Sequence, residues 1–199
     1  MLFSPDSCIL YFTTTLSTSV QAYSIPTAEL MPSLPPHPSP PNAIALSKKG
    51  EVLLSASPTP PTIYLQDRRW GGSAPVSFQP TDAHSPVTCA AFQTLEGPFQ
   101  PSYSNFVLGF QDGALAMYRL FLPDSAERSK AAHAHHYHTQ GFLLQPIRVG
   151  ATRKLHKAAM GGITAVEFLP GYKSRIVSIG HDGRCRLVDF EHGGSVLRT

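Results

Sequence analysis

The sequence predicts an all-β fold built from repeated antiparallel units. Short apolar segments recur along the 199 residues without the 3.6-residue periodicity of an amphipathic helix. The chain also carries 19 prolines, which helices tolerate poorly because each proline removes a backbone donor and clashes with the preceding turn. Two Asp-Gly pairs, Asp112-Gly113 and Asp182-Gly183, each stand between two apolar segments, as they do in tight β-hairpins.

The first unit opens the chain. Residues 8–25 read CILYFTTTLSTSVQAYSI, and we interpret residues 1–31 as a partial copy of the repeat. The proline-rich segment 32–41, PSLPPHPSPP, then favours an extended polyproline II conformation. We expect a stiff connector there, although its PxxP spacing is also what SH3-type and WW-type domains recognise.

The second unit covers residues 42–83. It holds three strand candidates: NAIAL at 42–46, EVLLSAS at 51–57 and TIYLQD at 62–67. A proline cluster around 58–61 stands where two other units carry Asp-Gly, which indicates a turn at this point.

The third unit, residues 84–122, and the last unit, residues 161–199, are the most alike. In each, an alternating strand is followed by a very apolar strand, an Asp-Gly turn and a further strand, as in NFVLGFQDGALAMYRL and RIVSIGHDGRCRLVDF. Gly accepts a positive φ and Asp bonds its own backbone, so these pairs predict hairpin turns. The predicted structural turn residues are Asp112, Gly113, Asp182 and Gly183.

A sheet of about four such strands cannot bury both of its faces alone. Apolar residues on both faces of the second strand therefore predict that the sheets stack on one another, and radial stacking gives a β-propeller of four-stranded blades. Closed propellers commonly use about 4–8 blades of roughly 40–45 residues. We therefore expect an incomplete propeller with further blades supplied by a longer chain; closure with another chain is the alternative.

The last unit resembles a WD repeat. The run from Ile176 to Asp189 has the family's apolar strand, a Ser at position 178, the Asp-Gly turn, and a strand that ends in Asp. The resemblance covers residues 8–122 and 161–199, but the signature Trp of the family is absent. Its place is taken by Tyr23, Leu65, Tyr118 and Val188 in the four units.

The resemblance also implies a buried hydrogen-bond network that locks each blade. In the family, this network joins a His, a strand Ser or Thr, the turn Asp and the Trp. Ser178 and Asp182 match two of its members, and His156 and His84 are looser matches to the His.

The function implied by the resemblance is that of a non-catalytic protein–protein interaction scaffold. Propellers of this family bind peptides or partner domains across the narrower face and the central opening. The contacts would come from residues just before the first strand of each blade and from the hairpin turns. The candidate partner-binding residues are His84, Asp112, His181 and Arg184.

Residues 123–160 interrupt the repeat, and we interpret them as an inserted loop. They hold six Lys and Arg residues against two acidic ones, in a chain whose formal net charge is +3. This basic segment favours a second hypothesis, an RNA-associated component of a nuclear assembly that contacts phosphate. A solvated loop, or a strand edge guarded by Lys and Arg, is the simpler interpretation.

The same segment contains a histidine-rich tract. Neutral imidazoles at such spacing can bind Zn²⁺ or Ni²⁺, so a metal-binding protein or a propeller enzyme is a third hypothesis. No carboxylate or cysteine nearby completes a defined site, and we expect no metal and no cofactor. The tract comprises His133, His135, His136 and His138.

No catalytic motif is present in the sequence. We find no paired carboxylates, no phosphate loop and no H-E-x-x-H, and therefore expect no enzyme. The three cysteines, Cys8, Cys89 and Cys185, lie far apart, which is typical of a reducing compartment. The N-terminus lacks a signal-type apolar run, so we expect an intracellular protein, cytoplasmic or nuclear, that does not enter a membrane.

Overall fold

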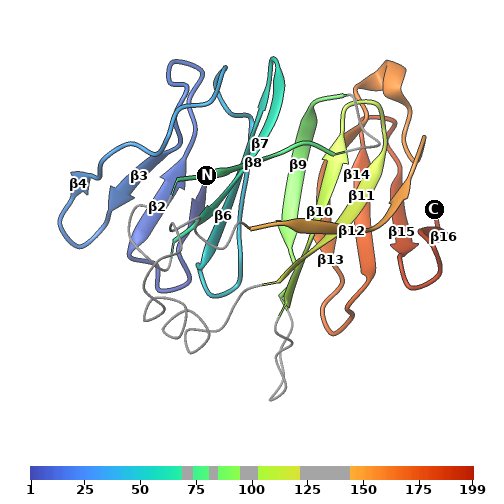
Figure 1. Ribbon diagram of the computed structural model, residues 1–199. Coiled ribbons are helices and arrows are strands. Elements are labelled where there is room, and N and C mark those ends of the chain that lie inside the picture. The colour runs from blue at the N-terminus through green and yellow to red at the C-terminus, as the bar shows by residue number, and fades with distance from the viewer. Residues whose placement is uncertain (69–73, 81–84, 95–102, 122–143) are drawn as a thin grey trace, which may run out of the picture.

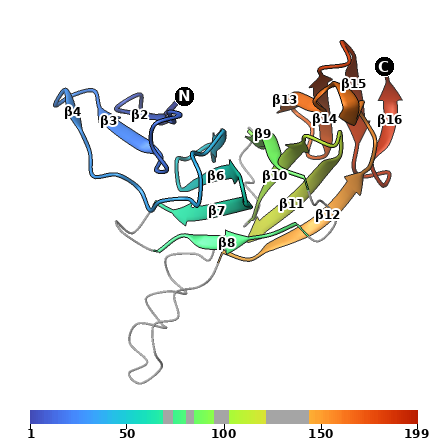
Figure 2. The ribbon, with the colours of Figure 1, turned by 90° about the horizontal axis from the view of Figure 1, so that it is seen from above.

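The computed structural model describes residues 1–68, 74–80, 85–94, 103–121 and 144–199. Within these residues, the chain folds into four antiparallel sheets, each with its four strands in sequence order (Figure 1). Sheets follow one another along an arc when seen from above (Figure 2). This arrangement confirms the all-β, antiparallel fold class predicted from the repeats.

The first two sheets come from the N-terminal half. The first contains β1 (Leu2–Phe3), β2 (Ile9–Phe12), β3 (Gln21–Ser24) and β4 (Glu29–Leu30). The second contains β5 (Ala43–Leu46), β6 (Val52–Pro58), β7 (Pro61–Asp67) and β8 (Val76–Phe78). The unit predicted as a partial copy thus supplies a sheet with all four strands.

The third and fourth sheets come from the C-terminal half. The third contains β9 (Val87–Phe92), β10 (Tyr103–Phe110), β11 (Leu115–Phe121) and β12 (Pro146–Thr152). The 3-10 turn η1 (Ala158–Met160) precedes the fourth. That sheet contains β13 (Ile163–Phe168), β14 (Arg175–Gly180), β15 (Cys185–Asp189) and β16 (Ser195–Arg198).

Strand β12 corrects the prediction that residues 123–160 form a loop. Residues 146–152 pair with β11, from Leu115 opposite Thr152 to Leu120 opposite Pro146, as the outer strand of the third sheet. The loop was predicted because residues 123–160 interrupt the repeat, but an outer strand tolerates the Pro and Arg residues found here because one of its edges faces solvent. Pairing with β11 therefore outweighs the local preference.

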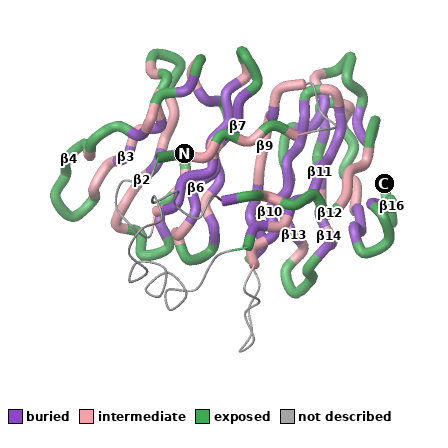
Figure 3. The backbone as a smooth tube through the Cα atoms, in the orientation of Figure 1, coloured by how far each residue is buried: buried purple, intermediate pink, exposed green. Residues whose placement is uncertain are grey.

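The core lies between the sheets. Strand β10 is buried on both faces: Phe106 and Leu108 pack with residues of the second sheet, and Val107 packs with residues of the fourth. All three side chains are fully buried, as the continuous buried stretch of β10 in Figure 3 shows. Each such burial contributes about 1.5–3 kcal/mol, so stacking provides most of the stability of the sheets.

The inner strands of neighbouring sheets are also joined by polar contacts. Thr88 on β9 has its Oγ1 atom 2.5 Å from the carbonyl oxygen of Ile163 on β13. The Asn42 side chain, just before β5, donates to the carbonyl of Val87 over 3.0 Å. The second, third and fourth sheets thus meet along their inner strands.

The outward faces of the first and fourth sheets have no neighbouring sheet among the residues described. Apolar side chains are therefore partly exposed there: Leu30 is 65% exposed and Ile179 is 46% exposed. In the part of the chain that the structure covers, no helix has the length and apolar character needed to span a membrane.

Candidate functional site

The hairpin turns β2–β3, β6–β7, β10–β11 and β14–β15 lie along one edge of the sheets, because the strands alternate in direction. The connectors that lead into β5 and β13 reach the same edge, at the top of Figure 1. We call this the upper edge and the opposite one the lower edge. Of the predicted partner-binding residues, Asp112, His181 and Arg184 lie on the upper edge, in the turns of the third and fourth sheets.

The two Asp-Gly turns have the same local geometry. The Oδ1 atom of Asp112 accepts from the backbone N–H of Ala114 at 2.9 Å, and Asp182 accepts from Arg184 in the same way at 3.2 Å. The glycines that follow have φ values of 81° at Gly113 and 71° at Gly183, in the left-handed region.

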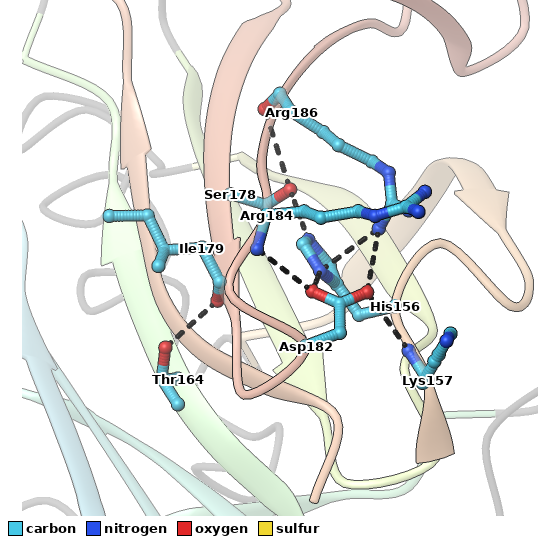
Figure 4. Close-up of polar contacts among 8 residues, drawn as sticks. All are labelled: His156, Lys157, Thr164, Ser178, Ile179, Asp182, Arg184 and Arg186. Atoms are coloured by element: carbon cyan, nitrogen blue, oxygen red, sulfur yellow. Dashed lines mark hydrogen bonds and ion pairs between the residues drawn. The ribbon is translucent and has the colours of Figure 1, made fainter. Parts of the chain in front are cut away.

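A buried polar network lies beneath the turn of the fourth sheet. His156, in the connector before β13, places Nδ1 2.8 Å from Oδ1 of Asp182 and Nε2 3.0 Å from Oγ of Ser178. Arg186 on β15 donates to the other oxygen of Asp182 over 3.3 Å. In Figure 4 these side chains point toward one another from the connector, β14, the turn and β15. The Asp182 carboxylate therefore ties the turn to the connector and to β15, and the His156 ring extends the network to β14.

The electrostatics of this network favour a charged carboxylate. The hydrogen bond from His156 holds the pKa of the Asp182 carboxyl well below its usual range, with further help from the backbone N–H groups of Arg184 and Lys157. With the proton on Nδ1, the His156 ring donates to Asp182 and accepts from the Ser178 hydroxyl, so every atom is satisfied. Arg186 Nη1 lies 3.0 Å from Nδ1, but with this proton in place it donates to the Asp182 carboxylate and not to the ring.

Ser178, His156 and Asp182 are connected as in a Ser-His-Asp catalytic triad, but the three side chains are closed off from solvent. Ser178 is fully buried, and His156 and Asp182 have side chains that are 0% and 1% exposed. A nucleophile must reach the scissile group of its substrate, and the Ser178 hydroxyl cannot. The arrangement is placed to hold the blade together rather than to meet a substrate.

Glycine makes room for the His156 ring. A Cβ atom at Gly180 would stand 2.1 Å from Nδ1 of His156, closer than any real contact. A side chain at this position would expel the imidazole. The sequence indicates this only indirectly, since Gly180 precedes the turn rather than lying in it.

A second histidine network, which the sequence analysis missed, lies in the second sheet. His37 belongs to the segment predicted as a plain proline-rich connector, yet its side chain is buried and its Nε2 is 2.8 Å from Oγ of Ser55 on β6. Ser55 lies opposite Tyr64 in the β6–β7 hairpin, just as Ser178 lies opposite Arg186 in the β14–β15 hairpin. The ring centroids of Tyr64 and His37 are 4.2 Å apart. His37 is therefore the counterpart of His156.

The backbone of each histidine is also bound in the same way. His37 donates its N–H to the carbonyl of Thr18, and His156 donates to that of Gly113, both in the hairpin turn of the preceding sheet. The signal in the sequence was a His six or seven positions before the first strand of a sheet. The proline cluster in the β6–β7 turn supplies no carboxylate, so Nδ1 of His37 has no partner within the structure described. Burial lowers the pKa of His37 to about 4.

The third sheet has no such network in its described part. Its hairpin carries Leu108 at the position of Ser178, and Leu108 is fully buried in the apolar core. His84, the predicted histidine of this sheet, lies outside the described residues. This sheet is held by aromatic packing instead, with Phe106 stacked on Tyr118 at 5.3 Å between ring centroids.

The Asp at the end of β15 anchors the lower edge. Asp189 is buried and accepts from Ser174 at 3.0 Å and from Arg175 at 3.2 Å. Burial alone would raise its pKa, but the backbone N–H of Glu191 and these side chains lower it. Both carboxylate oxygens of Asp189 are thus occupied by hydrogen bonds within the fold.

The metal hypothesis finds no support among the described residues. They contain no group of three or more His, Cys, Asp or Glu side chains placed to hold an ion. The histidine-rich tract at 133–138 lies outside the described residues, and its role stays a prediction.

Comparison with known proteins supports the fold. No model of a protein family matches the sequence, and no curated protein matches it. Solved structures do match, among them the WD40 propeller protein U3-55K, with a TM-score of 0.66 over 98% of this chain and 15% sequence identity. This chain spans 49% of the U3-55K chain. At that identity the likeness shows the fold alone: the four sheets have the architecture of half of a WD-repeat β-propeller.

Proposed function

We propose that the chain is a non-catalytic protein–protein interaction scaffold of the WD-repeat type, with its partner contacts on the upper edge. The observation that carries this proposal is the division of polar groups in the fourth sheet. Ser178, His156 and Asp182, which are connected like a catalytic triad, are buried beneath the turn. His181 and Arg184 in the same turn are exposed. A rigid frame that presents exposed turn residues suits recognition.

The place of action inferred for this scaffold is the interior of the cell, in the cytoplasm or the nucleus. The three cysteines support a reducing compartment, because all of them are free in the structure.

The proposal is tested by capturing proteins on the immobilised full chain and then measuring each captured protein in purified form. We expect a direct partner to cross-link beside Asp112, His181 or Arg184, as mapped by mass spectrometry. Its affinity should fall at least about tenfold in a His181→Ala/Arg184→Ala variant, because a few exposed anchors dominate such interfaces.

A matched control carries Lys49→Ala and Lys173→Ala, two exposed residues in turns of the lower edge. This control should bind like the unmodified chain. Cross-links confined to the lower edge would refute the placement of the site. Binding that disappears on nuclease treatment would instead support the RNA-associated alternative.

A further inference from the structure

Basic side chains gather on the upper edge above the fourth sheet. They come from two segments, the connector 153–162 and the β14–β15 turn with the start of β15, residues 181–186. These segments hold five Lys and Arg residues and one carboxylate, Asp182. The exposed basic residues of these segments are Arg153, Lys154, Lys157, His181 and Arg184, and we call the last four of them the basic rim patch.

The single carboxylate does not face solvent. The Asp182 side chain is 1% exposed and is occupied by His156 and Arg186. The patch therefore presents cationic groups outward while its counter-charge stays beneath the surface, which leaves a positive potential at the rim.

The buried network also fixes the spacing of the patch. One carboxylate receives the backbone N–H of Lys157 at 3.4 Å through Oδ2 and that of Arg184 at 3.2 Å through Oδ1. In Figure 4 both residues flank Asp182 on opposite sides. The backbones of two residues with cationic side chains, from distant parts of the sequence, are thus held by the same group, so the backbone needs little further ordering on binding.

An apolar contact lies next to the cations. The 3-10 turn Ala158–Met160 follows Lys157 directly, and Met160 is 51% exposed. The connector stays close to the turn beyond this point, because His181 donates its backbone N–H to the carbonyl of Gly162 at 3.0 Å. A flexible thioether beside exposed cations fits a ligand that carries both acidic and apolar side chains.

We propose that the basic rim patch binds an acidic segment of a protein partner, with carboxylates at Lys157 and Arg184 and an apolar side chain at Met160. This inference rests on the proposed function and adds the chemistry of the partner. Phosphate in RNA would meet the same cations but would make no use of Met160, so the structure favours the acidic peptide.

The test measures fluorescence anisotropy of a labelled eight-residue peptide of glutamate and leucine against the full chain at low salt. We expect saturable binding that weakens as salt is raised, since exposed charge pairs are screened. The same peptide with glutamine in place of glutamate should bind at least about tenfold more weakly, which corresponds to about 1.4 kcal/mol.

Variants locate the site. Lys157→Glu/Arg184→Glu should lower the affinity at least about tenfold, whereas Lys49→Glu/Lys173→Glu, with the same change in charge on the lower edge, should stay within about twofold. Met160→Ser should weaken the leucine-containing peptide and leave an all-glutamate peptide unchanged. Circular dichroism melting curves of all variants confirm that each is folded.

Three outcomes would overturn the inference. These are equal binding by the two charge-reversal variants, equal binding of the glutamate and glutamine peptides, and stronger competition by a uridine oligonucleotide than by a peptide of equal charge. If a partner protein depends on His181 and Arg184 but the acidic peptide does not bind, the proposed function stands and only the acidic chemistry fails.

Discussion

At the scale of single residues, His156 has the largest structural role in the fourth sheet. Its ring joins Asp182 to Ser178, and its backbone N–H reaches Gly113 in the preceding sheet. Resemblance to the WD repeat indicated Ser178 and Asp182, with His156 as a looser match. In the structure the partner of Asp182 is His156 and not its sequence neighbour His181, which is exposed. Sequence proximity does not decide which imidazole points inward.

Loss of the His156 ring should destabilise the fold. We expect His156→Ala to lower the free energy of unfolding by about 2–3 kcal/mol, because a hydrogen bond to a buried charge is lost. Urea denaturation followed by circular dichroism measures this. His181→Ala is the control and should change the stability by less than about 0.5 kcal/mol; equal losses in both variants would contradict the network.

The space beside Gly180 provides a second test at this scale. Gly180→Ala should lower the free energy of unfolding by about 1–3 kcal/mol, because the new methyl group overlaps the His156 ring. In a His156→Ala background the ring is gone, so the cost of the same substitution should shrink markedly. A double-mutant cycle measures the coupling, and additive effects would show that the clash does not occur.

His37 should make the stability depend on pH. Its folded pKa of about 4 lies below the usual value of 6.5, so the unfolded chain binds the proton more readily. The contribution of neutral His37 is then complete above about pH 6.5 and decreases as the pH falls toward 4. The pKa of Asp182 is lowered from 3.8, so its contribution is complete throughout this window and is lost only at lower pH.

Melting temperatures at pH 7 and pH 4.5 test this dependence. The difference should be smaller in His37→Gln than in the unmodified chain, because glutamine can still bond Ser55 but does not titrate. His181→Gln serves as a matched exposed control and should retain the full difference. An unchanged difference in the His37 variant would exclude it as the source.

At the scale of elements, the second strands of the third and fourth sheets differ in what covers them. Strand β10 is buried on both faces, whereas β14 is covered on one face and leaves Ile179 46% exposed on the other. Both strands and their turns were predicted, because an apolar run before Asp-Gly is a local signal. Strand β12 was not predicted, since only its pairing with β11 makes it a strand.

Truncations on these two strands should therefore differ in cost. Leu108→Ala should destabilise the protein by about 2–5 kcal/mol because it leaves a cavity in the core. Ile179→Ala, on the uncovered face of β14, should cost less than about 1 kcal/mol. Guanidinium unfolding midpoints measure both, and a large loss at Ile179 would show that the face of β14 is covered in solution.

At the scale of the whole molecule, the sheets act as one stacked array. Apolar clusters lie between each pair of neighbouring sheets, and polar contacts join the second sheet to the third and the third to the fourth. Stability should therefore depend on contacts between sheets as well as on those within them.

Thr88→Val tests the contact between the third and fourth sheets. The change keeps the shape but removes the hydroxyl that lies against the carbonyls of Ile163 and Gly109. We expect a loss of about 1–2 kcal/mol, because a carbonyl between the sheets loses its donor. Thr164→Val removes a hydrogen bond within one sheet, to Ile179, at an exposed position, and should cost less.

The sequence by itself determined the repeating strand–turn–strand plan, the two Asp-Gly hairpins and the all-β class, because these depend on neighbours a few residues apart. Only the tertiary structure decided that His37 and His156 are equivalent, that residues 146–152 form a strand, and that Lys157 and Arg184 share one carboxylate. Those features require segments that lie far apart in the chain to meet, and strand pairing and the stacking of sheets, rather than any local preference, bring them together.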